Sequence, residues 1–171
     1  RQAALSGFFA PAVLGVMQKH SDWAPAVVDG RKSRLADPSL AADQLPLVEN
    51  TLLAYKADSV IQQLLADTLA NDATPTPLRL SLLATIERSE LTGKQTPSAW
   101  TAAVTRQLAS ADDAVVRQAI GTARLLGDES FHALLMNLAR DAARDESLRI
   151  AALKALGAKA GEPDANLFGL L

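Results

Sequence analysis

The stretch DDAVVRQAIGTARLLGDESFHALLMNLARDAARDESLRIAALKALG, residues 112–157, repeats one helical pattern almost twice. Arg117 and Arg149 stand at matching places in its Ala- and Leu-rich segments, and Arg79 stands at a third such place upstream. Apolar residues lie one position before and three positions after each arginine: Leu78 and Leu82, Val116 and Ile120, Leu148 and Ala152. Positions four residues apart share one helix face. The pattern therefore predicts three equivalent helices, each with a buried face.

Small residues follow each arginine at two further positions, two and six residues later. They are Ser81 and Thr85, Ala119 and Ala123, Ala151 and Ala155. These positions are also four residues apart, so they share a face as well. Small side chains at this spacing predict that another helix approaches closely there.

A second helix is predicted before each arginine helix, marked by Leu69-Ala70, Leu108-Ala109 and Leu138-Ala139. The polar connectors NDATPTP, SADDA and RDAARDES separate the two helices of each pair. Pro77 suits a first helical turn, and Asp112 or Asp113 and Asp145 suit N-caps. The unit is therefore helix, short turn, helix. The Leu markers lie 39 and then 30 residues apart, so the repeat is irregular.

These helix pairs resemble HEAT-type repeats, which carry an Asp in the turn and an Arg early in the second helix. The likeness is good over 112–119, fair over 145–151 and poor over 72–80, where two prolines intervene. It implies an all-α fold, an α-solenoid of irregular HEAT-like helix pairs over residues 59–158. Residues 1–58 then form a helical region that is a candidate cap, with a helix ending near Asp58. Residues 159–171 form a tail or linker.

A second resemblance rests on LPLVENTLLAYKADSVIQQLLADTLAND, residues 45–72, and LRLSLLATI, residues 78–86. These are similar to the helical-repeat segments of large secreted bacterial proteins. Such proteins join a sugar-dehydrogenase-like propeller to HEAT-like repeats and a haem-binding Cys-x-x-Cys-His module. The resemblance implies a repeat segment alone, because this chain has no Cys.

Composition limits the classes of function. The net charge is −2, which gives no general attraction to nucleic acid or to anionic membranes. The absence of Cys excludes disulfides and thiolate chemistry. No apolar run approaches the ~20 residues that a membrane span needs. The chain opens on Arg1 and not on Met, so we expect a piece of a longer protein. Its compartment stays open, with periplasmic or secreted favoured by the second resemblance.

The arginines at 79, 117 and 149 are the most regular polar feature, and two interpretations stay open. They could form a ladder of cations that binds phosphate or an acidic peptide. Alternatively each pairs with a turn carboxylate (Asp72, Asp112 or Asp145) or binds backbone carbonyls between repeats, which the five-donor guanidinium suits. We expect the structural role.

The run DGRKSR contains the only dense basic cluster, Arg31, Lys32 and Arg34. It could contact a phosphate or a partner, but a solvated loop is the simpler interpretation. Trp23 and Trp100 stand near helix starts and are expected to cover the ends of the core.

No catalytic, cofactor-binding or metal site is predicted. His20 and His132 each lack a second ligand at helical spacing, and His132 is expected at the surface.

We therefore expect a non-catalytic scaffold or protein-interaction module of a larger protein. Its partner would be another protein or a neighbouring domain, held on a face lined by the arginine-bearing helices. Two alternatives remain, a spacer in a secreted sugar-dehydrogenase or c-type cytochrome-like protein, and a HEAT-like nucleic-acid-binding domain. The acidic composition makes nucleic acid the less expected partner.

Overall fold

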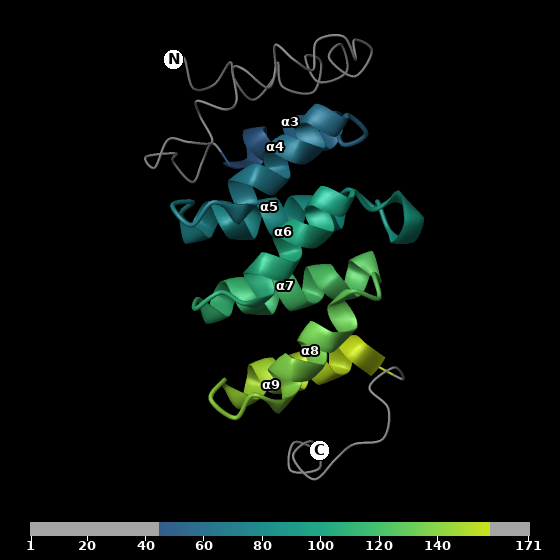
Figure 1. Cartoon of the computed structure of the whole chain (residues 1–171). Coiled ribbons are helices and arrows are strands. Elements are labelled where there is room, and N and C mark those ends of the chain that lie inside the picture. The colour runs from purple at the N-terminus through teal and green to yellow at the C-terminus, as the bar shows by residue number, and fades with distance from the viewer. Residues whose placement is uncertain (1–44, 158–171) are drawn as a thin grey trace. The chain divides into compact units, whose positions relative to one another are not determined.

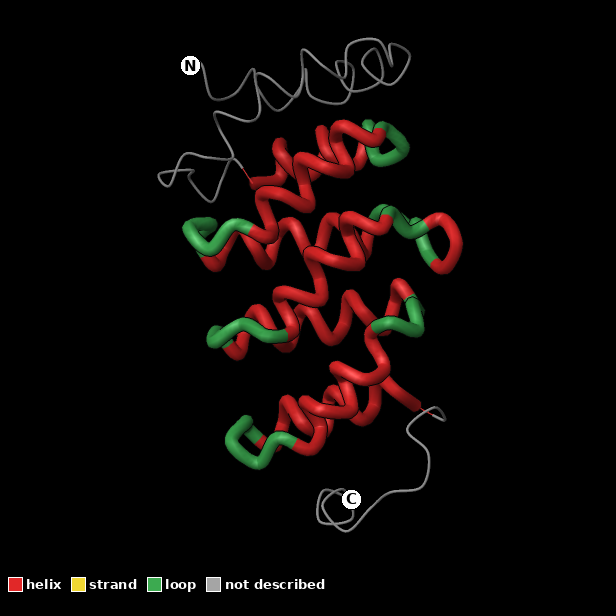
Figure 2. The backbone as a smooth tube through the Cα atoms, viewed as in Figure 1, coloured by secondary structure: helices red, strands yellow, loops and turns green. Residues whose placement is uncertain are grey.

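The computed structural model describes residues 45–157 of the chain (Figure 1). Every regular element in this range is helical, which confirms the predicted all-α class. Short turns join the helices (Figure 2). The elements are α3 (Leu45–Ala54), α4 (Ser59–Ala70), α5 (Thr76–Arg88), the 3-10 helix η3 (Gly93–Gln95), α6 (Ser98–Leu108), α7 (Asp113–Leu126), α8 (Phe131–Arg140) and α9 (Glu146–Leu156).

Aspartate side chains define three of the helix starts. Asp58 accepts from the Val60 N–H at 2.8 Å, Asp112 from Ala114 at 3.0 Å and Asp145 from Ser147 at 2.9 Å. Each bond satisfies a backbone donor that has no partner within the helix. The caps at Asp112 and Asp145 and the proline in the first turn of α5 confirm the sequence predictions. The boundary expected near Asp58 is corrected, because α3 ends at Ala54 and Asp58 caps α4.

The chain divides between Ser89 and Glu90 into two compact units. In the described part of the first unit, α5 packs against both α3 and α4. Glu49 on α3 accepts hydrogen bonds from the Ser81 hydroxyl at 2.6 Å and from Arg88 at 2.7 Å, both on α5. Buried apolar residues of this unit include Val48, Leu52, Ile61, Leu65, Leu69, Leu78, Leu82, Leu83 and Ile86.

In the described part of the second unit, α6 pairs with α7 and α8 pairs with α9. In addition, α7 packs against α9 and α6 packs against α8, so corresponding helices of the two pairs lie together. Trp100 in the first turn of α6 is 1% exposed, as expected of a residue that covers the core. Other buried apolar residues are Val104, Leu108, Val115, Val116, Ile120, Leu126, Phe131, Leu135, Leu148 and Leu156.

The predicted helix register is confirmed for the apolar positions. The residues before and three after each arginine are at most 3% exposed in all three helices. The small-residue face is confirmed only in part. Ser81, Thr85, Ala119 and Ala123 are buried, whereas Ala151 and Ala155 are only partly buried. Helix α7 packs against both α6 and α9, whereas α9 is the last helix that the structure describes.

Across residues 45–157 no helix combines the length and hydrophobicity that a bilayer crossing requires.

Candidate functional site

Two of the three repeat arginines bind backbone carbonyls next to their own helix. Arg79 donates through Nε to the Thr74 carbonyl at 2.8 Å and through Nη2 to the Asp72 carbonyl at 2.7 Å. Arg149 donates through Nε to the Ala139 carbonyl at 3.1 Å, near the end of the preceding helix. Each side chain therefore holds the second helix of a pair to the turn or helix before it. This is the carbonyl-binding interpretation of the sequence.

Arg117 behaves differently, because it reaches forward to the next pair. Its Nη2 donates to the Ser147 hydroxyl at 2.6 Å and lies 4.0 Å from the Asp145 carboxylate, at the start of α9. The expected partner of Arg117 was either backbone carbonyls between repeats or a turn carboxylate, that of Asp112 in its own turn. That carboxylate instead accepts from the Ala114 N–H as the N-cap of α7.

Arg144, in the turn between α8 and α9, completes this link and is a residue that sequence reasoning missed. It donates to the Ser110 carbonyl at 2.9 Å and to the Asp113 carboxylate at 3.2 Å, at the start of α7. Arg117 therefore reaches from α7 to the start of α9, and Arg144 reaches from the turn before α9 to the start of α7. The sequence signal that could have revealed it is the mixed-charge connector RDAARDES, in which Arg144 lies outside both predicted helices.

The basic residues Arg31, Lys32 and Arg34 lie outside the described residues, as do His20 and Trp23.

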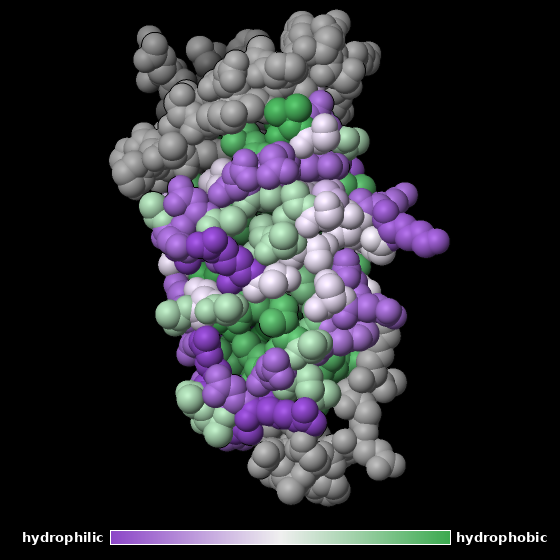
Figure 3. Space-filling view, in the orientation of Figure 1, coloured by the Kyte–Doolittle hydropathy of each residue, from purple (hydrophilic) through white to green (hydrophobic). Residues whose placement is uncertain are grey.

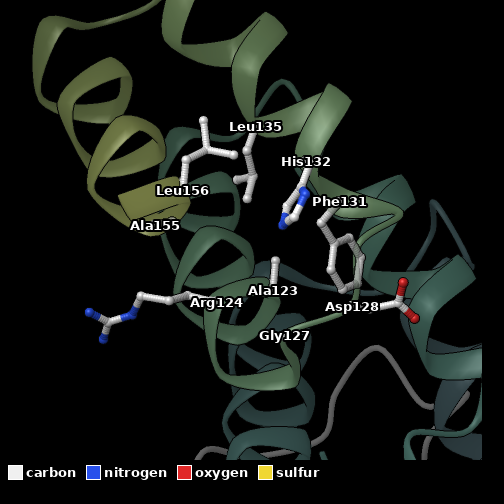
Figure 4. Close-up of a pocket in the computed structure, with 9 residues that line it drawn as sticks. All are labelled: Ala123, Arg124, Gly127, Asp128, Phe131, His132, Leu135, Ala155 and Leu156. Atoms are coloured by element: carbon white, nitrogen blue, oxygen red, sulfur yellow. The ribbon is translucent and has the colours of Figure 1, made fainter. Parts of the chain in front are cut away.

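A cavity of about 340 Å³ lies in the second unit, where α7 ends, α8 begins and α9 ends (Figure 4). Gly127 forms the left-handed end of α7 at φ 67°, a conformation that suits glycine, and the chain turns there into α8. The cavity is lined by Ala123, Arg124, Gly127, Asp128, Phe131, His132, Leu135, Ala155 and Leu156. In the space-filling view, hydrophobic residues gather over the region of α7 and α8 and are flanked by hydrophilic ones (Figure 3).

Helical spacing places the residues of α8 in this cavity. Phe131 and Leu135 are one turn apart, and His132 and Leu135 are three residues apart, so all three can face the same space. Phe131 and Leu135 are buried. The imidazole of His132 is half-buried and lies beside them (Figure 4). His132, which was expected at the surface, is thus partly exposed and lines the cavity.

Asp128 lines the cavity but is engaged elsewhere. It accepts from the Ser130 N–H at 2.9 Å and from the Thr101 hydroxyl at 3.3 Å. The backbone and hydroxyl of Ser130 are the main cause that holds the pKa of Asp128 below its ordinary value of 3.8, and Thr101 and the charge of His132 add to it. Asp128 is thus ionised at neutral pH, and its carboxylate points away from the cavity centre (Figure 4).

The lining of the cavity combines apolar and charged side chains. Most of the wall is apolar, and its charged or titratable side chains are Arg124, Asp128 and His132. Within residues 45–157 no three His, Asp or Glu side chains gather in a way that could hold a metal ion. The arrangement can enclose an apolar group and place a guanidinium and an imidazole near it.

Comparisons with protein-family models, with curated proteins and with solved structures find no match to this chain.

Proposed function

We propose that the chain is a helical-repeat scaffold, an α-solenoid of HEAT-like helix pairs that binds a protein partner. The observation that carries this proposal is the packing in the second unit, where α6 contacts α8 and α7 contacts α9. Repeat proteins bury their apolar faces in this way, each unit against the next. The crossed contacts of Arg117 and Arg144 support it, because they join the turns of consecutive pairs.

A solenoid requires that the same stacking continue from the pair α4–α5 to the pair α6–α7. The chain has no Cys, so cysteines introduced in pairs can carry spin labels without background. Gln63 on α4, Ala102 on α6 and Ala133 on α8 are exposed and lie in the first helices of the three pairs, six, six and five residues before Leu69, Leu108 and Leu138. Packed helix axes lie roughly 8–10 Å apart.

Pulsed electron spin resonance on the three double-cysteine variants tests the stack. We expect similar distances for the Gln63–Ala102 and Ala102–Ala133 pairs, and about twice that distance for Gln63–Ala133. A broad or much longer Gln63–Ala102 distribution beside a sharp Ala102–Ala133 one contradicts a continuous solenoid.

Partner binding needs its own test, because a stack without a partner is only a spacer. A photo-reactive amino acid at Ala133 probes the α6–α8 layer, and one at Lys154 probes the α7–α9 layer; both positions are exposed. We expect cross-linking in cells to one defined protein from one of the two layers. That protein must then bind the purified chain. If neither position cross-links, the interaction role fails even if the solenoid stands.

A further inference from the structure

The cavity between α7, α8 and α9 has the size of a small ligand site. Its volume of about 340 Å³ is at the lower end of the roughly 300–1,000 Å³ range of ligand pockets. Leu135 and Leu156 stand on one side of it and Ala123 on another, with the Phe131 ring next to His132 (Figure 4). An apolar group of modest size can therefore be removed from water there.

Two basic side chains at this cavity have no hydrogen-bond partner among residues 45–157. Arg124 is exposed, and its guanidinium extends away from the wall into solvent (Figure 4). It makes no ion pair with a described residue, in contrast to Arg117 and Arg144. The imidazole of His132 also makes no hydrogen bond to a described residue. Asp128 is the acid of the lining, and its oxygens already accept from Ser130 and Thr101.

The side-chain donors that remain available at the cavity are therefore those of Arg124, on the solvent side, and of His132, beside Phe131. A guanidinium binds a carboxylate through charge-assisted hydrogen bonds. Asp128 would repel an anion, but Figure 4 shows its carboxylate on the side of the cavity opposite Arg124. An anionic group can therefore lie at the Arg124 side while an apolar body fills the space between Leu135 and Leu156.

We propose that this cavity binds a small apolar carboxylic acid. The alkyl or aryl body lies against Leu135, Leu156 and Phe131, beside His132, and the carboxylate lies at the solvent side of the cavity, where the exposed Arg124 side chain turns to donate to it. The proposal does not rest on partner binding, because the cavity is lined by α7, α8, α9 and the turn after α7 alone.

The test uses octanoate as the probe and 1-octanol as its uncharged counterpart. The chain has only two histidines, so the imidazole NMR signals of His132 are identified by comparison with a His132→Gln variant. On titration of the whole chain with octanoate, we expect the His132 signals to shift and to saturate, and those of His20 to stay. Octanol should bind about tenfold more weakly, because it cannot form the charge-assisted bonds.

Two variants separate the roles of charge and space. Arg124→Gln should weaken octanoate about tenfold and leave octanol unchanged. Ala155→Leu should reduce the affinity for both, because it fills the cavity from the α9 side. Lys94→Gln is the matched control, since Lys94 is an exposed cation of the same unit that does not line the cavity. Helical circular dichroism and thermal melting confirm that each variant folds.

Three outcomes would overturn the proposal. The first is that octanoate leaves the His132 signals unchanged up to millimolar concentrations. The second is that octanol shifts those signals with equal affinity. The third is that Arg124→Gln weakens octanoate no more than Lys94→Gln does.

Discussion

Arg144 Nη1 lies 3.2 Å from the Asp113 carboxylate and so joins two interhelical turns that are 31 residues apart in the sequence. Arg117 makes the opposite connection, from α7 to Ser147 at 2.6 Å. Both contacts are between side chains that lie outside the apolar core. These directional contacts specify that the turn before α9 lies beside the turn before α7. Apolar packing is non-directional and specifies such a pairing less well.

Replacement of Arg144 by Ala should lower the free energy of unfolding by about 1 kcal/mol. The side chain is 23% exposed and donates to a backbone carbonyl as well as to Asp113, so its bonds are less screened than those of a fully exposed pair. Urea denaturation measures the change. Arg124→Ala is the control, because Arg124 is exposed and has no partner among the described residues, and it should change stability by less than about 0.5 kcal/mol.

A double-mutant cycle assigns part of this loss to the carboxylate. Combined with Asp113→Ala, the Arg144→Ala change should cost a few tenths of a kcal/mol less than it does alone. Strict additivity of the two substitutions would show that the Asp113 contact contributes nothing in solution.

Ala119→Leu and Ala151→Leu should have different effects, although the two residues occupy matching positions in their helices. Ala119 is fully buried in α7, so three extra carbon atoms overpack the core and should cost about 1–3 kcal/mol. Ala151 in α9 is only partly buried, and its leucine can turn toward solvent at a cost below about 0.5 kcal/mol. Thermal melting of the two variants compares them. Equal losses would show that α9 is covered as completely as α7.

Glu49→Ala should destabilise the first unit by about 1–2 kcal/mol. The substitution removes the acceptor of the Ser81 hydroxyl, which is 8% exposed, and of the Arg88 guanidinium. The cost should fall when Ser81 is also replaced by Ala, since the buried hydroxyl is then absent. Asp67→Ala is the matched control, because Asp67 accepts only an exposed bond from Gln63. A loss for Glu49→Ala no larger than that of the control would refute the link between α3 and α5.

Asp128 and Asp145, which lie just before α8 and α9, should make stability depend on pH. Hydrogen bonds from the hydroxyl and N–H of Ser147 are the main cause that lowers the pKa of Asp145 below 3.8, and the bonds from Ser130 do the same for Asp128. A lowered pKa in the folded state means that the ionised form stabilises the fold. This contribution is present above about pH 4 and is lost as the pH falls through the folded-state pKa.

The measurement compares the melting temperature of the unmodified chain with that of Asp145→Asn from pH 7 to pH 3. Asparagine keeps a capping oxygen but cannot ionise. We expect the unmodified chain to melt higher at pH 7 and this advantage to shrink below about pH 4. A difference that is independent of pH would show that the charge of Asp145 does not stabilise the helix.

The positions of the helices could be read from the sequence because they depend on neighbours within a few residues. Asp112 and Asp145 precede their helices as N-caps, and the apolar residues beside Arg79, Arg117 and Arg149 are buried as their spacing predicts. The end of α3 was placed too late, near Asp58. Asp58 is the N-cap of the next helix, α4. The boundary was misplaced because the same types of polar residue occur at the N-caps of helices and in the turns that follow helix ends.

The candidate site could be read only in part. The sequence contains GDES as a turn and Phe131 and Leu135 as one helical face, but it does not show that the end of α9 approaches them. No single segment of the sequence therefore predicted the cavity beside His132.

The sequence by itself determined the all-α fold, the order of the helices and the apolar residues beside the three arginines that the helices bury. Short-range backbone bonds and the periodicity of apolar side chains are sufficient for these. Only the tertiary structure decided the partners of Arg117 and Arg144, the difference between Ala119 and Ala151, and the space beside His132. The two arginine contacts join groups 30 and 31 residues apart in the sequence. Like the burial of the two alanines and the cavity, they depend on how the helices pack and not on the local sequence pattern.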